Sequence, residues 1–275
     1  MWPKPSTTLP PGRAVPELIE VEVYRRLVER TIGWRVADVA APDAWFLKRG
    51  LTVDQVTGVL RGAVVTGTGR VGKLLVVHLD DDRPDLGLRF GMTGRLVLDG
   101  VAPIARLEYG PSRDDPTWNR FGLGFDRGRR LWLSDPRRLG GVELDPDLSA
   151  LGPDAWSITV AQLRRALAGS SVPLKARLLD QSRVAGLGNL LVDETLWRAS
   201  LDPTRPAGGL DRAETARLQR HVRTTVRALF DRGGSHTGDL HRARHRGGSC
   251  PRDGAPLTRS TVGGRTTYSC PVHQR

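Results

Sequence analysis

Four side chains near the end of the sequence have the types and spacing of a tetrahedral metal site. They follow the pattern C-x2-D-x16-C-x2-H and are Cys250, Asp253, Cys270 and His273. Two thiolates, one carboxylate and one imidazole form a permissible zinc ligand set, although it is weaker than four thiolates. Because a carboxylate is an unusual ligand in a structural site, His241 or His245 could replace Asp253. The alternative is a hairpin without metal that keeps its shape by packing.

A tight glycine turn joins two expected helices in the segment LLDQSRVAGLGNLLVDE, residues 178–194. Gly186 and Gly188 allow backbone N–H groups to approach a ligand closely. The start of the second helix favours an anion, and the Asn189 amide can donate beside it. The segment therefore predicts a phosphate-binding corner. The alternative is an ordinary helix–helix turn.

The composition and the hydrophobic pattern of the sequence change along the chain. Residues 1–15 are rich in proline and small polar residues and predict a flexible arm. An amphipathic helix is expected from Pro16 to Val28. Short β-prone runs between glycine and aspartate clusters predict a sandwich or barrel from about 35 to 145. Beyond it we expect helices, and then a small hairpin at the end of the chain; the expected helices are 160–167, 174–179, 187–200 and 213–230.

The charge of the chain restricts its partners. A formal net charge of +12 over 275 residues predicts a polyanionic partner, either nucleic acid or an anionic membrane surface. No apolar run approaches the roughly 20 residues of a spanning helix, and the first residues lack a signal-peptide segment. Two late cysteines, Cys250 and Cys270, do not make a secreted disulfide framework. We therefore expect a cytoplasmic, nucleoid-associated protein.

The segment LLDQ…VAGLGNLLVDETLW resembles the helix–two-turns–helix motif of the formamidopyrimidine-DNA glycosylase/endonuclease VIII family. In that family the turn and its asparagine grip phosphates of the damaged strand, so the resemblance implies that Asn189 and Lys175 contact DNA. The implied fold is α+β, in the order of the family from about residue 16 to 275. Its parts are an N-terminal β-sandwich with an N-terminal helix (16–147), a helical helix–two-turns–helix domain (148–235), and a linker with a zinc-finger-like β-hairpin (236–275).

The segment PELIEVEVYRR resembles the amino-terminal PELPEVE of the family, with Ile19 in place of the second proline. In the family the first proline is the mature N-terminus. Its secondary amine attacks C1′ of the damaged nucleotide and forms a Schiff base, and the following glutamate moves protons. The resemblance therefore implies that Pro16 is the nucleophile and Glu17 the general acid/base.

The residues before Pro16 conflict with that chemistry, because an internal prolyl nitrogen is an amide and cannot attack a sugar carbon. One interpretation is that translation starts at a GTG codon for Val15, so that residues 1–15 are a misassigned start and methionine removal frees Pro16. We favour this interpretation. The other is that the arm is real and that the protein is a monofunctional glycosylase, uses another amine, or only binds DNA.

The β-rich half contains further segments that resemble DNA contacts of the family. Lys73 opens a strand in the setting where the family binds the phosphate near the lesion, and we group it with the catalytic residues. FGMTGRL resembles the loop whose methionine, here Met92, fills the gap left by the everted base. DPRRLG resembles the loop with an arginine opposite the orphaned base and an aromatic wedge, which implies Arg137, Arg138 and Leu139. Leucine stands where the family often has phenylalanine.

The tail resembles the zinc finger of the family, C-x2-C-x16-C-x2-C. This implies a structural Zn²⁺ on the four ligands above and places Arg265 at the finger tip, where it holds a phosphate. We predict a monomeric DNA glycosylase that excises damaged, oxidised bases from duplex DNA, with lyase cleavage at abasic sites if Pro16 is a free N-terminus. The alternatives are a silent or monofunctional binder of damaged or abasic DNA, and a basic RNA-binding protein without lesion preference.

Overall fold

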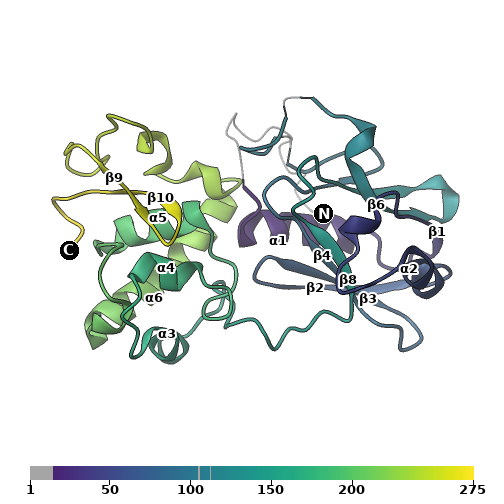
Figure 1. Cartoon of the computed structure of the whole chain (residues 1–275), viewed down its shortest axis with the longest axis horizontal. Coiled ribbons are helices and arrows are strands. Elements are labelled where there is room, and N and C mark those ends of the chain that lie inside the picture. The colour runs from purple at the N-terminus through teal and green to yellow at the C-terminus, as the bar shows by residue number, and fades with distance from the viewer. Residues whose placement is uncertain (1–14, 105, 112) are drawn as a thin grey trace, which may run out of the picture. The chain divides into compact units, whose positions relative to one another are not determined.

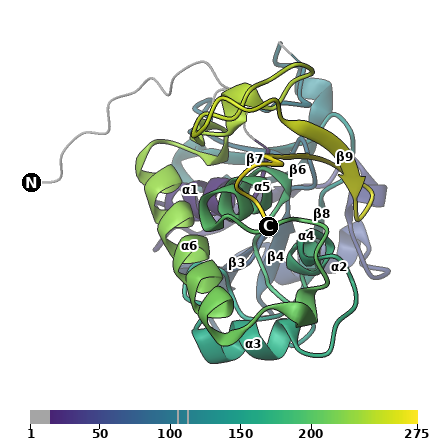
Figure 2. The ribbon, with the colours of Figure 1, turned by 90° about the vertical axis from the view of Figure 1, so that its left-hand side faces the viewer.

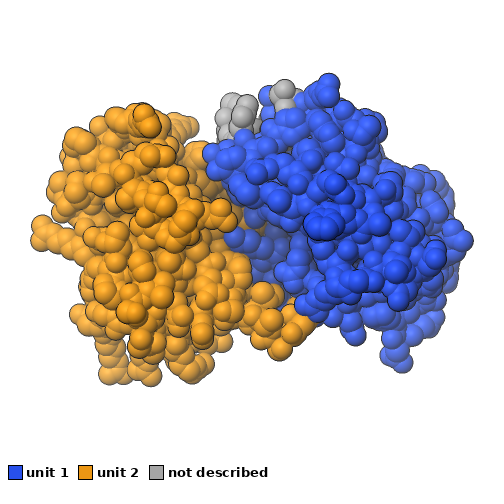
Figure 3. Space-filling model, in the orientation of Figure 1, with its two compact units in different colours: residues 1–16, 20–146 blue, residues 17–19, 147–275 orange. Residues whose placement is uncertain are grey.

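The computed structural model describes residues 15–104, 106–111 and 113–275, so the predicted arm lies outside the described residues except for Val15. The chain divides into two compact units, which are coloured in Figure 3. Among the described residues, unit 1 contains 15–16 and 20–146, apart from 105 and 112. Unit 2 contains Glu17–Ile19 and Asp147–Arg275.

Unit 1 is built from two antiparallel four-stranded sheets, with the orders β1-β6-β7-β5 and β2-β3-β4-β8 (Figure 1). The strands are β1 (Val36–Ala40), β2 (Val65–Val71), β3 (Leu74–Leu79), β4 (Leu86–Arg89), β5 (Arg95–Leu98), β6 (Asn119–Phe125), β7 (Arg130–Ser134) and β8 (Gly141–Leu144). Buried aliphatic and aromatic side chains from both sheets form one hydrophobic cluster. The predicted N-terminal β-sandwich is therefore confirmed.

Two helices accompany the sheets. Helix α1 (Leu18–Glu29) contributes Tyr24 and other apolar side chains to the core of unit 1, while Leu18 and Ile19 belong to the core of unit 2. Helix α2 (Val53–Leu60) was not predicted. Its sequence signal is a capping box, in which Thr52 and Gln55 satisfy each other's backbone N–H groups,.

Unit 2 contains the helices α3 (Val160–Leu167), α4 (Leu174–Leu179), α5 (Asn189–Ala199) and α6 (Arg212–Asp231). All four correspond to expected segments. Helix α5 begins later than predicted because Gly188 is its extended N-cap residue. It is buried on nearly all sides because α4, α6 and β10 pack around it (Figure 2).

The chain ends in a hairpin of β9 (Thr258–Val262) and β10 (Arg265–Ser269). Gly263 and Gly264 join the strands, and both have positive φ, as a two-residue hairpin turn requires,. The preceding segment folds into the 3-10 turns η5 (Ser235–Thr237) and η6 (His241–Ala243). The predicted terminal hairpin is confirmed. No helix in the described ranges combines the length and apolar character needed to cross a membrane.

Candidate functional site

Unit 1 brings Met92, Arg137 and Leu139 together, and we call these three residues the wedge cluster. Met92 lies in the loop after β4, and the other two lie in the loop after β7. The Arg137 Nη1 atom is 3.9 Å from the Met92 sulfur, and Leu139 is 50% exposed. A side chain on Gly91 would place its Cβ only 2.6 Å from the Leu139 backbone carbon. Glycine at this position therefore allows the two loops to touch.

A buried carboxylate, Asp135, holds both loops of the wedge cluster. It has no exposed surface. It accepts hydrogen bonds from the Thr93 hydroxyl, from the Gly140 N–H at 2.8 Å and from the Arg137 N–H at 3.2 Å. A buried carboxylate needs such donors to offset its lost hydration. Sequence reasoning missed Asp135, although it opens the DPRR turn.

Arg138 forms an ion pair within unit 1, which differs from its predicted role as a DNA contact. Its Nε and Nη2 atoms each donate to the Asp43 carboxylate at 2.6 Å, as a bidentate pair,. The pKa of Asp43 is held below its ordinary value, chiefly by this hydrogen bonding. Arg138 has a left-handed backbone, with φ of 57°. The ion pair therefore anchors a sharp turn beside Arg137 and Leu139.

The predicted residue Lys73 lies in the turn between β2 and β3, after Gly72 with φ of 58°. Its side chain is half-buried. Strand β3 begins at the next residue, as the sequence indicated.

The glycine turn of unit 2 holds a carboxylate of the chain itself. The Glu17 side chain is buried and accepts hydrogen bonds from the N–H groups of Gly188, Leu190 and Leu191 at 3.0, 2.8 and 3.1 Å. These are the donors that we expected to bind a phosphate. That expectation is corrected, because an internal anion occupies the start of α5. A Cβ on Gly188 would lie 2.3 Å from the Glu17 carboxyl carbon.

Lys175 also differs from its predicted role. It is 0% exposed, and its ammonium donates to Asp193 at 2.7 Å and to the Thr266 carbonyl at 3.0 Å. Burial lowers the pKa of Lys175, and the neighbouring Asp193 opposes that shift. Arg244 binds the other oxygen of Asp193 at 2.8 Å. Lys175 therefore ties α4 and α5 to the hairpin and presents no surface to DNA.

Asn189 and Arg265 lie close to this buried network. The Asn189 side-chain amide donates to the Thr266 carbonyl at 3.1 Å, while its own Oδ1 is buried and has no hydrogen-bond partner among the described residues. Arg265 is the preceding residue on β10 and is exposed at the hairpin turn. Unit 2 thus brings together these two predicted phosphate contacts.

Pro16 is buried, and Val15 precedes it in the described chain. Its nitrogen is consequently a peptide nitrogen here. Glu17 follows directly, so the two residues predicted to be catalytic are adjacent, with Glu17 held at the start of α5.

The terminal hairpin brings its four predicted metal ligands together. The donor atoms of Cys250, Asp253, Cys270 and His273 all lie within 4.8 Å of one another, and neither His241 nor His245 belongs to the group. Cys250 Sγ is 3.7 Å from His273 Nδ1, and Cys270 Sγ is 3.3 Å from Asp253 Oδ2. Tetrahedral zinc with bonds of about 2.0–2.3 Å requires ligand separations of roughly 3.3–3.8 Å. The two separations given above fall within that range, whereas the 2.7 Å between His273 Nδ1 and Asp253 Oδ2 is shorter.

Neighbouring groups orient two of these ligands. His273 Nε2 lies 3.3 Å from the Trp197 carbonyl, and His273 Nδ1 lies 2.7 Å from Asp253 Oδ2, where it donates to that carboxylate when no metal ion is bound. Trp197 Nε1 and the Arg252 N–H donate to Cys250 Sγ at 3.3 and 3.4 Å. Such donors suit a thiolate. The four donor groups could hold a metal ion.

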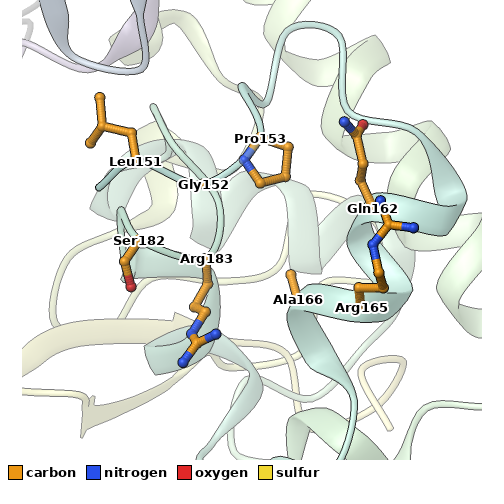
Figure 4. Close-up of a pocket in the computed structure, with 8 residues that line it drawn as sticks. All are labelled: Leu151, Gly152, Pro153, Gln162, Arg165, Ala166, Ser182 and Arg183. Carbon is orange, nitrogen blue, oxygen red and sulfur yellow. The ribbon is translucent and has the colours of Figure 1, made fainter. Parts of the chain in front are cut away.

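Unit 2 also has an open depression of about 380 Å³, shown in Figure 4. Gln162, Arg165 and Ala166 of α3 line one part of it, and Ser182 and Arg183 line another. None of the predicted site residues borders it.

Comparison with family models assigns both units. Residues 15–142 match the model of the formamidopyrimidine-DNA glycosylase N-terminal domain, and residues 150–239 match that of the formamidopyrimidine-DNA glycosylase H2TH domain. Among curated proteins, the formamidopyrimidine-DNA glycosylase of Paracoccus denitrificans is 36% identical, over 95% of this chain and 100% of the relative. The Deinococcus radiodurans enzyme of the same name is 34% identical, over 94% and 97%.

Solved structures agree with that assignment. A complex of Lactococcus lactis FPG with DNA containing Fapy-dG superposes with a TM-score of 0.79 at 27% identity, over 94% of this chain and 100% of that chain. A complex of the Lactococcus lactis protein with DNA containing an abasic site gives 0.78 at 26% identity, over 94% and 99%. The likeness extends over both units.

Proposed function

The chain belongs to the formamidopyrimidine-DNA glycosylase family, and from that premise we propose that it excises damaged bases from duplex DNA. The reaction is cleavage of the N-glycosidic bond at a base turned out of the helix. Its relatives carry this name, and the related structures hold DNA with Fapy-dG or an abasic site. We propose lesion-bearing duplex DNA as the substrate.

The wedge cluster is the observation that carries this proposal. Turning a base out of the duplex costs on the order of a few kcal/mol, and side chains inserted into the vacated space offset that cost. Met92, Arg137 and Leu139 come from two loops that Asp135 holds rigidly. A thioether, a guanidinium and an exposed leucine in one fixed cluster suit the gap and the orphaned base.

We assign the bond-breaking roles to Pro16 and Glu17. When Pro16 is the first residue, its secondary amine attacks C1′ with its lone pair, and the base leaves with the electrons of the glycosidic bond and takes up a proton. The prolyl nitrogen loses its proton, and the C1′–O4′ bond then opens as O4′ takes up a proton, which gives the Schiff base. The Schiff base acidifies the C2′ proton, whose removal expels the 3′-phosphate. Three backbone N–H groups hold the Glu17 carboxylate in place to move these protons,. We place Lys73 at the phosphate beside the lesion.

Borohydride trapping on duplex DNA with an abasic site tests the nucleophile. One form of the protein begins at Met1, and the other begins at Pro16. We expect only the second form to be trapped. Equal trapping of both forms would mean that another amine reacts. If neither form is trapped, a base-release assay on Fapy-dG duplex separates a monofunctional glycosylase from a silent binder of damaged DNA.

We further propose that Cys250, Asp253, Cys270 and His273 hold a structural zinc ion. The ion would tie the two ends of the terminal hairpin together and so position Arg265,. Metal analysis of carefully purified protein tests this assignment. A content near one equivalent supports it, and a content under about 0.2 equivalents contradicts it.

A further inference from the structure

A large aromatic side chain, Trp45, stands exposed beside the loop that carries Arg137 and Leu139. It lies in the 3-10 turn η1 (Ala44–Phe46) and is 69% exposed. Its neighbour Phe46 is fully buried and anchors the turn in the core of unit 1. An exposed indole on a turn anchored in the core offers a large flat face on which a partner can stack.

Asp43 connects Trp45 to the loop of the wedge cluster. One Asp43 oxygen accepts the Trp45 N–H at 3.2 Å, and the carboxylate takes both donors of Arg138. Trp45 is thus two residues from one end of this ion pair, and Leu139 is one residue from the other. The Lys48 N–H also donates to the Val142 carbonyl at 2.8 Å, which joins the same two segments again.

One cation lies beside the indole. The Lys48 ammonium donates to the Trp45 carbonyl at 3.0 Å and lies 5.4 Å from the centre of the Trp45 ring. The Arg138 guanidinium is paired with Asp43, so its charge is already balanced. An exposed aromatic ring with a cation beside it suits a strand of nucleic acid, in which phosphates alternate with flat bases.

We propose that Trp45 is a further DNA-binding residue that stacks on a base of the strand opposite the lesion. Leu139 has no aromatic face, and Trp45 supplies one from the adjoining turn. The proposal rests on the proposed function, because it assumes that the wedge cluster enters the duplex at a damaged site. Trp45 contributes to binding and to the choice of opposite base, and it takes no part in bond breaking.

Fluorescence and affinity on one duplex test the proposal. The duplex carries a tetrahydrofuran abasic analogue, which cannot be processed, opposite 2-aminopurine, whose emission falls when it stacks. The wild type in these tests is the form of the protein that begins at Pro16, and with it we expect quenching on binding. Trp45→Ala should abolish the quenching and raise Kd about 5- to 100-fold, whereas Trp45→Phe should stay within about threefold of the wild type. Val101→Ala, which shortens another exposed side chain of unit 1, should change neither.

The outcomes separate this inference from the proposed function. If the wild type releases Fapy-dG and binds the abasic duplex, but Trp45→Ala binds and quenches like the wild type, only the role of Trp45 is wrong. A wild type that neither releases the base nor prefers the abasic duplex overturns both. Retained base release at saturating enzyme in Trp45→Ala confirms that the residue acts in binding.

Discussion

At the scale of single residues, Asp135 makes the most specific prediction, because one carboxylate organises two loops. In Asp135→Asn an NH₂ group replaces one oxygen and cannot accept the N–H or hydroxyl donors that Asp135 holds. We expect a loss of about 2–4 kcal/mol in the free energy of unfolding, and weaker binding to abasic duplex. Urea unfolding measures the first effect. Asp54→Asn, at an exposed position in α2, should stay within about 0.5 kcal/mol of the wild type.

Substitution of Lys175 tests whether this residue stabilises unit 2 or contacts DNA. Lys175→Met keeps most of the volume and removes the ammonium that binds Asp193 and the Thr266 carbonyl. We expect a loss of stability of about 1–3 kcal/mol, since Arg244 still pairs with Asp193,. The salt dependence of DNA binding should stay the same, because no phosphate contact is removed. If the slope of log K against log salt concentration is smaller by about one in Lys175→Met, Lys175 contacts a phosphate directly.

His241 makes stability depend on pH. Burial, with a smaller contribution from Arg244 and His236, lowers the pKa of His241 to about 4. The unfolded chain takes up the proton near pH 6.5 and the folded chain does not, so the contribution is present above pH 6.5 and is lost as pH falls toward 4. With allowance for solvent screening, the loss is about 1–2 kcal/mol. Denaturant titrations at several pH values should show a shallower decline of stability with falling pH in His241→Gln than in the wild type.

At the scale of elements, the start of α5 depends on a glycine. Gly188→Ala would drive a methyl group into the Glu17 carboxyl group, whose carbon is 2.3 Å from the added Cβ. We expect a loss of about 2–4 kcal/mol and impaired base release, because Glu17 must move. Gly58→Ala, in α2, has no atom within 4 Å of its added Cβ and should raise stability by about 0.5–1 kcal/mol. If the two substitutions have equal effects in thermal melts and glycosylase assays, the close packing of Gly188 against Glu17 does not matter for stability or activity.

The elements that the sequence predicted are those with local signals. The helices of unit 2 follow from apolar periodicity, and the terminal hairpin follows from Gly263 and Gly264. Helix α2 was not predicted, because its clearest sequence signal is a single capping box and this signal lies in a β-rich region. The occupant of the glycine turn could not be predicted, since Glu17 and Gly188 are 171 positions apart.

The residues of the candidate site also divide into those with a local sequence signal and those without one. Met92, Arg137, Asn189 and Arg265 were predicted as DNA contacts from short motifs, and these four remain predictions. Their supports were not identified, because Asp43 and Arg138 lie 95 positions apart and meet only in the folded chain. Lys175 was assigned to DNA for the same reason. The motif contains the lysine, but the ion pair with Asp193, which buries it, forms only in the folded chain.

At the scale of the whole molecule, net charge overstates the number of groups available to phosphate. The chain carries +12, yet many arginines are paired internally, among them Arg25 with Glu22, Arg205 with Glu214 and Arg244 with Asp193. Such pairs leave the net charge unchanged but remove donors from the surface. The cations that we expect at the DNA are few and placed by rigid elements, namely Lys73, Arg137 and Arg265.

The dependence of DNA binding on salt measures that number directly. Each phosphate neutralised contributes about −0.9 to the slope of log K against log salt concentration, so the two cations that we assign to phosphates, Lys73 and Arg265, predict a slope near −2. Arg265→Ala should reduce the slope by about one and weaken binding to damaged and undamaged duplex alike, because Arg265 is exposed at the hairpin turn. Arg61→Ala is the matched control, since Arg61 pairs with Asp38 in unit 1 and lies outside both clusters. Titrations of abasic duplex at several salt concentrations give all three slopes. A flat response in the wild type would contradict phosphate binding, and an unchanged slope in Arg265→Ala would remove the hairpin from the interface.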